Sequence, residues 1–318
     1  MRTRLPPATN SHREALWSAL DRMARVHSAC CGEITSRHAP LTRLNRTLTQ
    51  KERETTMATQ TSETNGRLWG ARARDWAEVQ EGQCAAAFHA VLAHAGVAPG
   101  TRHLDLGCGA GMAAALSASL GATVAGIDAA EAMLEIARER TPRGDFRQGD
   151  LEALPFADAS FDLVTGFNAF QYAGDPSLAL REAGRVTRPG GMIVIMTWGE
   201  PAGMEAASLV TVLKPLLPPA PPGAPGPFAL SNEDALRAFA VAGGLTPGKV
   251  FDVETHWSYR SESEALRGLG ASGVAIRAIE HSGADALIAT YHTALAPFRQ
   301  PDGSFRIGAR FRCLVATP

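Results

Sequence analysis

An apolar strand that runs directly into a glycine-rich turn and then into a helix constrains the fold of this chain most. The stretch RHLDLGCGAGMAAALSASLG, residues 102–121, places Gly107, Gly109 and Gly111 immediately after the strand. Glycines in such a turn let the backbone approach a bound molecule closely, and the following helix presents free N–H groups at its N-terminus. The stretch therefore predicts a strand–turn–helix unit with a ligand at the turn.

The same alternation of strand and helix continues as far as Trp198. Strands that alternate with helices of about 10 to 15 residues indicate right-handed βαβ units and a parallel sheet. We expect the fold class to be α/β, with helices on both faces of the sheet and a last strand that pairs antiparallel. The expected strands lie at 102–109, 123–128, 145–150, 161–168, 191–198, 248–259 and 303–318, and the expected helices at 75–96, 110–121, 130–141, 176–190, 231–244, 261–273 and 283–298.

Composition divides the chain into two parts. The first 56 residues carry ten Lys and Arg against five Asp and Glu, a net charge of +5, and we expect a disordered extension over 1–56. A targeting peptide and a nucleic-acid arm are alternatives, and Met57 is a further candidate for the true start of translation. Residues 57–318 are expected to form one domain, with the proline-rich stretch 200–230 as a linker or as a lid over the site.

Charge and cysteine content exclude several classes of partner. The net charge of −1 offers no field that would attract nucleic acid or an anionic membrane, and no apolar run approaches the roughly 20 residues of a membrane span. The cysteines form no CxxC pair and no metal-ligand spacing, which favours a reducing, cytoplasmic compartment and no bound metal. The five cysteines are Cys30, Cys31, Cys84, Cys108 and Cys313.

The residues around the turn decide which cofactor it holds. A dinucleotide-binding turn needs G-x-G-x-x-G, whereas here the third position of that pattern is Met112. Asp105 lies two residues before Gly107, where its carboxylate would repel a pyrophosphate. An acid at this place suits a ligand that carries an ammonium and a sulfonium, which is S-adenosylmethionine.

Four motifs in order resemble the class I S-adenosylmethionine-dependent methyltransferases, of the kind that includes ubiquinone and menaquinone C-methyltransferases. The resemblance extends from Trp69 to Trp198 and is looser beyond. It implies a Rossmann-like, seven-stranded, mostly parallel sheet with an antiparallel last strand. The motifs are LDLGCGAG, VAGIDAAEAML, GDLEALPFADASFDLV and REAGRVTRPGG.

The resemblance also implies where the cofactor binds. Asp105 would lie near the amino group of the methionine moiety, and Asp128 would bind the ribose hydroxyls. Asp150 and Leu151 would meet the adenine, and Asn168 would lie beside the sulfonium. The remaining cofactor-binding residues on this carry-over are Gly107, Cys108, Gly109, Ala129 and Met133. A helical Met is usually core filling, so Met133 keeps both interpretations.

The acceptor side is less defined by the sequence. We expect the methyl acceptor to be a small, flat, apolar molecule such as a phenol or quinone, which receives the methyl group on an O or C atom. Where many family members have a His after the fourth strand, this chain has Gln171 and Tyr172, so Tyr172 and His256 are the candidates for a general base. The candidate acceptor-binding residues are Trp69, Trp76, Gln171, Tyr172 and Trp198.

Two other functions stay open at this point. A NAD(P)-dependent oxidoreductase would need a glycine in place of Met112 and a proton relay, and neither is evident. A non-catalytic S-adenosylmethionine-binding protein would share the whole cofactor site. The sequence does not determine the oligomeric state.

Overall fold

The computed structural model describes residues 61–220 and 225–318, which fall within one unit of the chain, Leu48–Pro318. The expectations for residues 1–56 and for Met57, and residues 221–224 of the predicted lid, lie outside the described residues. In the described part, no helix is both long enough and apolar enough to cross a membrane.

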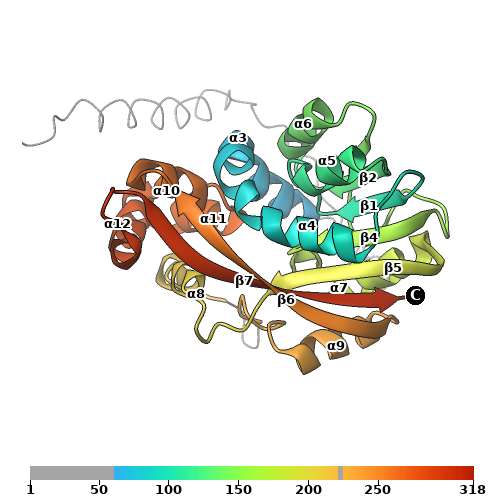
Figure 1. Ribbon diagram of the computed structural model, residues 1–318. Coiled ribbons are helices and arrows are strands. Elements are labelled where there is room, and N and C mark those ends of the chain that lie inside the picture. The colour runs from blue at the N-terminus through green and yellow to red at the C-terminus, as the bar shows by residue number, and fades with distance from the viewer. Residues whose placement is uncertain (1–60, 221–224) are drawn as a thin grey trace, which may run out of the picture. The chain divides into compact units, whose positions relative to one another are not determined.

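A seven-stranded sheet forms the centre of the fold, in the order β3-β2-β1-β4-β5-β7-β6 (Figure 1). Neighbouring strands from β3 to β5 are parallel, and β7 runs antiparallel to both β5 and β6. This arrangement confirms the predicted fold class, including the antiparallel last strand and its pairing near Val253, which lies opposite Phe311. The strands are β1 (Arg102–Leu106), β2 (Thr123–Asp128), β3 (Asp145–Gln148), β4 (Phe161–Phe167), β5 (Thr187–Trp198), β6 (Thr246–Tyr259) and β7 (Phe305–Thr317).

Helices cover both faces of the sheet, and several begin at side chains that the sequence makes good caps. Asp175, Asn232 and Ser272 each accept a hydrogen bond from a backbone N–H in the first turn of the helix that follows. The chain also forms a helix over 61–70. The longer helices are α4 (Ala85–His94), α5 (Met112–Ser119), α6 (Glu131–Arg140), α7 (Pro176–Val186), α9 (Glu233–Ala242), α10 (Glu262–Leu269), α11 (Gly273–Ser282) and α12 (Ala284–Leu295), with the shorter α3 (Ala73–Asp75) and α8 (Ala206–Thr211).

Two of the predicted helices differ from the observed ones, and one observed helix was not predicted. The expected helix 75–96 is interrupted by a π-helical turn, η1 (Trp76–Gln80), and a 3-10 turn, η2 (Glu81–Cys84), before α4 begins. The expected helix 176–190 ends at Val186, because Pro189 disfavours helical backbone at the residue before it, and the remaining residues start β5. Helix α11 was not predicted, since its sequence lies between two other helical stretches.

Two apolar layers hold the helices on the sheet. Helices α4 and α5 pack on one face, where Phe88 and Val91 meet Leu163 and Val194. Helices α7 and α9 pack on the other face, where Leu180 and Leu236 join a larger buried cluster. The carboxyl ends of β1, β2 and β4 are thereby left to carry the loops of a binding site, as in other open parallel sheets.

A ribbon of two strands extends beyond this sheet. Tyr259 at the end of β6 still pairs with Phe305 at the start of β7, well past the end of β5 at Trp198. Figure 1 shows α10, α11 and α12 gathered at this end of the ribbon. They form a second buried cluster that includes Trp257, Leu287 and Ile307.

Candidate functional site

The glycine turn connects β1 to α5 with left-handed backbone at Gly107, Gly109 and Gly111. A Cβ at Gly107 would lie 2.6 Å from that of Ala169, and one at Gly111 would lie 2.7 Å from that of Ala137. Both glycines are therefore required by the backbone conformation and by close packing. A Cβ at Gly109 would make only ordinary contacts, at 3.8 Å from Oε1 of Glu81 and from the indole nitrogen of Trp76, so this glycine is required by its left-handed backbone and not by close packing.

Asp128, at the end of β2, closes the turn from the side. Its Oδ2 accepts the Gly109 N–H over 2.8 Å, and its Oδ1 accepts the Ala130 N–H over 2.8 Å. Burial raises the pKa of this carboxyl, while the backbone hydrogen bonds act in the opposite direction. Each oxygen keeps a second lone pair, so the carboxylate can still accept ligand hydroxyls.

Asp105 lies directly under the turn and is 2% exposed. Its Oδ1 accepts a hydrogen bond of 2.7 Å from the Thr165 hydroxyl. Burial raises the pKa of Asp105 to about 7, with the nearby carboxylates of Glu81 and Asp128 adding to the rise and the Thr165 hydrogen bond opposing it. Asp105 does not cap α5, whose N-cap is Gly111.

A third carboxyl, that of Glu81 in η2, reaches the same turn. It accepts the Met112 N–H at the start of α5 over 3.2 Å and forms an ion pair with Arg140 of α6. Arg140 also donates to the Ala110 and Ala77 carbonyls, each over 2.9 Å. Burial raises the pKa of Glu81, and Arg140 counteracts the rise.

The charges of this cluster favour a cationic ligand. Asp105, Asp128 and Glu81 are opposed by the single guanidinium of Arg140, so the fully ionised cluster carries an excess of negative charge in a poorly solvated place. Burial raises the pKa of the Cys108 thiol well above its usual range, so it is not a nucleophile. In the described residues, no group of three or more His, Cys, Asp or Glu side chains could hold a metal ion.

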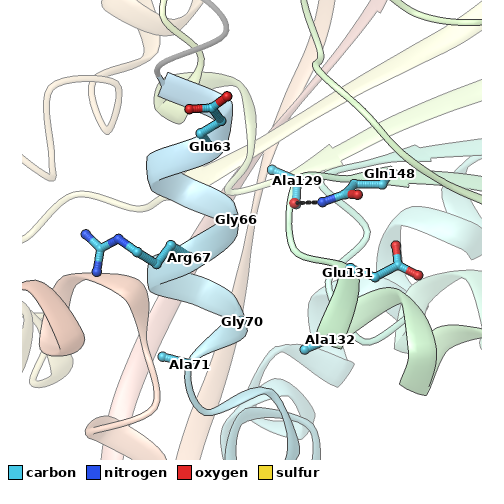
Figure 2. Close-up of a pocket in the computed structure, with 9 residues that line it drawn as sticks. All are labelled: Glu63, Gly66, Arg67, Gly70, Ala71, Ala129, Glu131, Ala132 and Gln148. Atoms are coloured by element: carbon cyan, nitrogen blue, oxygen red, sulfur yellow. Dashed lines mark hydrogen bonds between the residues drawn. The ribbon is translucent and has the colours of Figure 1, made fainter. Parts of the chain in front are cut away.

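The helix over 61–70 covers the loop that follows Asp128. A Cβ at Gly66 would lie 2.4 Å from the Ala129 carbonyl oxygen, which shows how closely the helix approaches this loop. Beside this contact is a pocket of about 500 Å³. Figure 2 shows the helix on one side of the pocket and the loop and helix after Asp128 on the other, with the Arg67 side chain pointing away from them. The Gln148 amide donates to the Ala129 carbonyl over 2.9 Å. The lining residues are Glu63, Gly66, Arg67, Gly70, Ala71, Ala129, Glu131, Ala132 and Gln148.

Aromatic and amide side chains lie at the other edge of the site. The Trp69 ring packs edge-on against Trp76, with ring centres 4.9 Å apart, and against Tyr172, with ring centres 5.8 Å apart. Asn168 has left-handed backbone at the end of β4, and its Oδ1 accepts from the Gln171 amide over 3.3 Å. The Trp76 indole nitrogen borders Gly109, so these aromatic rings lie next to the turn.

Three further residues that the sequence predicts at the cofactor lie in α6 and in the loop after β3. Met133 is 1% exposed and packs against Ala73, Ala77 and Ile136, which is a core role. Asp150 accepts the Glu152 N–H over 3.0 Å, and Leu151 is half-buried beside the cluster of α7 and α9. Both follow β3, whose end lies next to Asp128.

Trp198 and His256 lie on the ribbon side of the fold. Trp198 stacks on Phe311, with ring centres 5.1 Å apart, and contacts Trp257 at 5.8 Å. His256 is exposed on the face of β6 opposite to Trp257, so the structure does not bring it into the cluster around the turn. Burial raises the pKa of Tyr172, which keeps its hydroxyl protonated at neutral pH.

Four residues of the site were not found from the sequence. Glu81 and Arg140 reach the turn from η2 and α6, and their sequence separation hides the contact. His103 and Thr165 lie behind Asp105 as a consequence of the β1–β4 register. The available signal was His103 itself, which lies two residues before Asp105 and therefore on the same face of β1.

The strand order, with its antiparallel β7, and the glycine turn flanked by two acids define a Rossmann-like fold of the methyltransferase type. Residues 104–195 match a protein family described as "Methyltransferase domain". The chain therefore contains a class I S-adenosylmethionine-dependent methyltransferase domain, and S-adenosylmethionine is the cofactor of this class. The matched family gives no support to the oxidoreductase alternative.

Two relatives show how far the similarity extends. The chain is 41% identical over 106 residues to a demethylmenaquinone methyltransferase of Renibacterium salmoninarum, which covers 33% of this chain and 45% of that protein. It is 41% identical over 118 residues to a malonyl-[acyl-carrier protein] O-methyltransferase of Erwinia pyrifoliae, which covers 37% of this chain and 45% of that protein. The matches thus span less than half the length of these relatives.

Among solved structures, the YcgJ protein from Bacillus subtilis is similar with a TM-score of 0.47 and 23% sequence identity. The alignment covers 73% of this chain and 98% of that protein.

Proposed function

We propose that this protein transfers a methyl group from S-adenosylmethionine to a flat, apolar small molecule, at O or C of a phenol, quinone or similar compound. The observation that carries the cofactor part is the pair of carboxylates beside the glycine turn, the buried one of Asp105 and the half-buried one of Asp128. The anionic surroundings suit a ligand with a sulfonium and an ammonium, and the remaining lone pairs of the Asp128 carboxylate suit a ribose diol.

The cofactor-binding residues follow from this fit. Asp128 accepts the ribose hydroxyls through its remaining lone pairs, and Asp105 meets the ammonium. Gly107, Cys108 and Gly109 lie along the ligand, with Ala129, Asp150 and Leu151 toward the adenine and Asn168 toward the sulfonium. Met133 is buried below this surface and supports it by packing.

The bound cofactor supplies a methyl group on a sulfonium, which is an activated leaving group for in-line displacement. The protein's contribution is alignment of donor and acceptor, which can supply about 7–11 kcal/mol of the barrier. Asn168, Gln171 and the protonated Tyr172 are neutral hydrogen-bonding groups at that edge, so they orient an acceptor oxygen and do not remove its proton. We therefore assign no general base, and an acceptor that ionises readily suits the site best.

The aromatic side chains support an apolar acceptor. Trp69, Trp76 and Tyr172 line the edge next to the turn, and Trp198 at the end of β5 forms a separate aromatic cluster with Trp257 and Phe311. The Renibacterium relative is named for a quinone-type substrate, whereas the Erwinia relative is named for a malonyl group on an acyl-carrier protein. The aromatic lining favours the first of these chemistries.

The test is calorimetric titration of the full chain with S-adenosylmethionine, S-adenosylhomocysteine and NAD(P), followed by assay of S-adenosylhomocysteine release with a panel of phenols and quinols. We expect binding of both sulfur ligands, at least a hundredfold weaker in Asp128→Ala and unchanged in Asp285→Ala, an exposed acid on α12. Binding of NAD(P) alone would overturn the cofactor assignment. Cofactor binding without transfer to any acceptor would instead favour a non-catalytic S-adenosylmethionine-binding protein.

A further inference from the structure

Three buried polar side chains form a chain of hydrogen bonds that leads to the glycine turn. Nε2 of His103 lies 2.8 Å from Oγ1 of Thr165, and this hydroxyl donates to Oδ1 of Asp105 over 2.7 Å. His103 and Thr165 are fully buried, and Asp105 is nearly so. The chain thus runs from the interior of the protein to the carboxylate that lies under the turn.

The register of the sheet fixes this chain. Asp105 of β1 lies directly opposite Thr165 of β4, and His103 precedes Asp105 by two residues on the same face. Side chains in such positions are neighbours across a pair of strands. The three groups are therefore held by the most buried part of the fold, not by a loop.

The direction of the hydrogen bonds sets the state of the imidazole. Thr165 has one hydroxyl proton, which it donates to Asp105, so its contact with His103 requires a proton on Nε2 of the ring. Burial lowers the pKa of His103 to about 3, which keeps the ring neutral. In residues 61–220 and 225–318, Nδ1 of His103 is buried without a hydrogen-bond partner. An unpaired buried nitrogen disfavours folding, so packing alone gives no reason for a His here.

We propose that His103 is a positioning residue for the cofactor: through Thr165 it holds Asp105 in its charged form and in the orientation that meets the cofactor's ammonium. This inference rests on the proposed function. The other charged groups that face Asp105 are Glu81 from η2 and Asp128 from β2, and both disfavour its ionisation. The hydroxyl of Thr165, polarised by the His103 N–H, is the contact that favours it.

The test compares the pH dependence of ligand affinity in matched variants of the full chain. Thr165→Val keeps the shape of the side chain and removes the hydroxyl, whereas Thr165→Ser keeps the hydroxyl. The Kd of S-adenosylmethionine is measured by calorimetry from pH 5.5 to 8.5. The same titrations with 5′-methylthioadenosine, which lacks the ammonium, show how much of the pH dependence of the Kd comes from the adenosine part of the ligand alone.

We expect Thr165→Val to move the midpoint of the pH dependence upward by about one pH unit, which weakens binding at pH 7 by roughly fivefold. Thr165→Ser should stay near the wild type, and 5′-methylthioadenosine should show no such midpoint. His103→Leu should shift the midpoint in the same direction by a smaller amount, and it should add nothing in the Thr165→Val background. If His103 and Thr165 had only a structural role, their substitution would lower the melting temperature without moving the midpoint of the pH dependence.

Two outcomes separate this inference from the proposed function. We call the effect of His103 on Asp105 through Thr165 the relay. If the wild type binds S-adenosylmethionine but the midpoint is the same in Thr165→Val, the relay is wrong and the proposed function stands. If the wild type does not bind, the proposed function fails, and the relay is judged on urea unfolding of the ligand-free protein. Because the pKa of Asp105 is raised in the folded state, stability falls as pH rises through about 7, and this fall should move upward in Thr165→Val. If the free energy of unfolding falls over the same pH range in Thr165→Val as in the wild type, the relay is overturned.

Discussion

The carboxylates of Asp105 and Asp128 beside the glycine turn destabilise the ligand-free protein, because the first loses nearly all and the second part of its contact with water. Asp128 recovers part of this cost through the N–H groups of Gly109 and Ala130, whereas Asp105 has the Thr165 hydroxyl. A bound cation would offset the remaining cost. The site is therefore built to be more stable with a positively charged ligand than without one.

The affinity for S-adenosylmethionine should depend on pH through Asp105. Its pKa is raised to about 7, so the carboxylate gains a proton as the pH falls below 7 and loses its attraction for the ammonium. We expect the affinity to fall about tenfold per pH unit well below pH 7, since each unit of pKa corresponds to a tenfold change in the charged fraction. Calorimetry at pH 5, 6 and 7 with wild type and Asp105→Asn measures this. An equally steep pH dependence in Asp105→Asn would assign it to another group.

The two acids of the turn were predictable from the sequence because their roles depend on local order along the chain. Asp105 precedes the glycines by two residues, and Asp128 ends the next strand. The partners that tune them were not predictable in this way. Thr165 meets Asp105 across 60 residues of sequence, and the contact exists only once β1 and β4 pair in their observed register.

The ion pair between Glu81 and Arg140 joins three elements, since it connects η2 to α6 and to the start of α5. Removing the guanidinium would leave a buried carboxylate next to two others. We expect Arg140→Leu to lower the free energy of unfolding at pH 8 by about 3 kcal/mol, because an uncompensated buried charge is strongly unfavourable. Urea unfolding measures the loss.

Two controls identify the cause of that loss. Adding Glu81→Gln to Arg140→Leu removes the charge, so part of the stability should return. The loss should also be smaller at pH 5 than at pH 8, because the pKa of Glu81 is already raised by burial and rises further without Arg140. A loss that is the same at both pH values would point to packing.

The helix over 61–70 offers a matched pair of glycines. A Cβ at Gly66 would lie 2.4 Å from the Ala129 carbonyl oxygen, whereas one at Gly70 would make an ordinary contact of 3.7 Å with Ala130. We expect Gly66→Ala to displace the helix from the loop after Asp128 and to weaken binding of S-adenosylmethionine about tenfold or more. Gly70→Ala should leave binding unchanged and stabilise the protein by up to about 1 kcal/mol, as Gly to Ala does in a helix.

Calorimetry and thermal unfolding of the two variants decide this point. Equal affinities in Gly66→Ala and Gly70→Ala would mean that the helix is not part of the cofactor site.

The close approach of Gly66 to Ala129 was hidden from the sequence, where Gly66 and Gly70 read as ordinary interruptions of a polar stretch. The turns η1 and η2 were also hidden from the sequence, because the alanine-rich stretch that follows them predicts one unbroken helix. In the structure Gln80, Glu81 and Gln83 instead make hydrogen bonds to other elements.

Across the whole molecule, the described residues form a sheet with its site and a ribbon with its helices. The order of strands and helices up to Trp198 was predictable, because local periodicity and the rules for parallel sheets determine it. The place of α11 was not predictable, since it depends on packing between α8, α10 and α12, whereas the two long strands of the ribbon lie close to their predicted bounds of 248–259 and 303–318. Trp198 belongs to both parts, as it packs against the clusters on either side.

Because of this position, substitution of Trp198 should affect turnover of the methyl acceptor without affecting binding of the cofactor. We expect Trp198→Leu to lower kcat/KM for the methyl acceptor by about ten- to a hundredfold, since the loss of a large ring from an apolar site costs roughly 1–3 kcal/mol. The Kd of S-adenosylmethionine should stay within twofold, because Trp198 touches neither acid of the turn. Trp257→Phe is the control: its buried indole nitrogen has no partner within the described residues, so its loss forfeits no hydrogen bond. Steady-state kinetics and calorimetry measure both effects.

The pairing of Tyr259 with Phe305 has a consequence for how such a protein can diversify. The two ends of the segment 260–304 leave the ribbon side by side, so this segment is attached like an exchangeable module on a fixed frame. Its replacement by another helical hairpin would leave β1, β2 and β4 untouched. The segment also packs against the helical start of the domain, where Gly273 lies against Trp69 and Arg267 pairs with Asp75 and Glu78. Grafts at these two positions would therefore change the aromatic edge at Trp69 and leave in place the strand ends that carry Asp105 and Asp128.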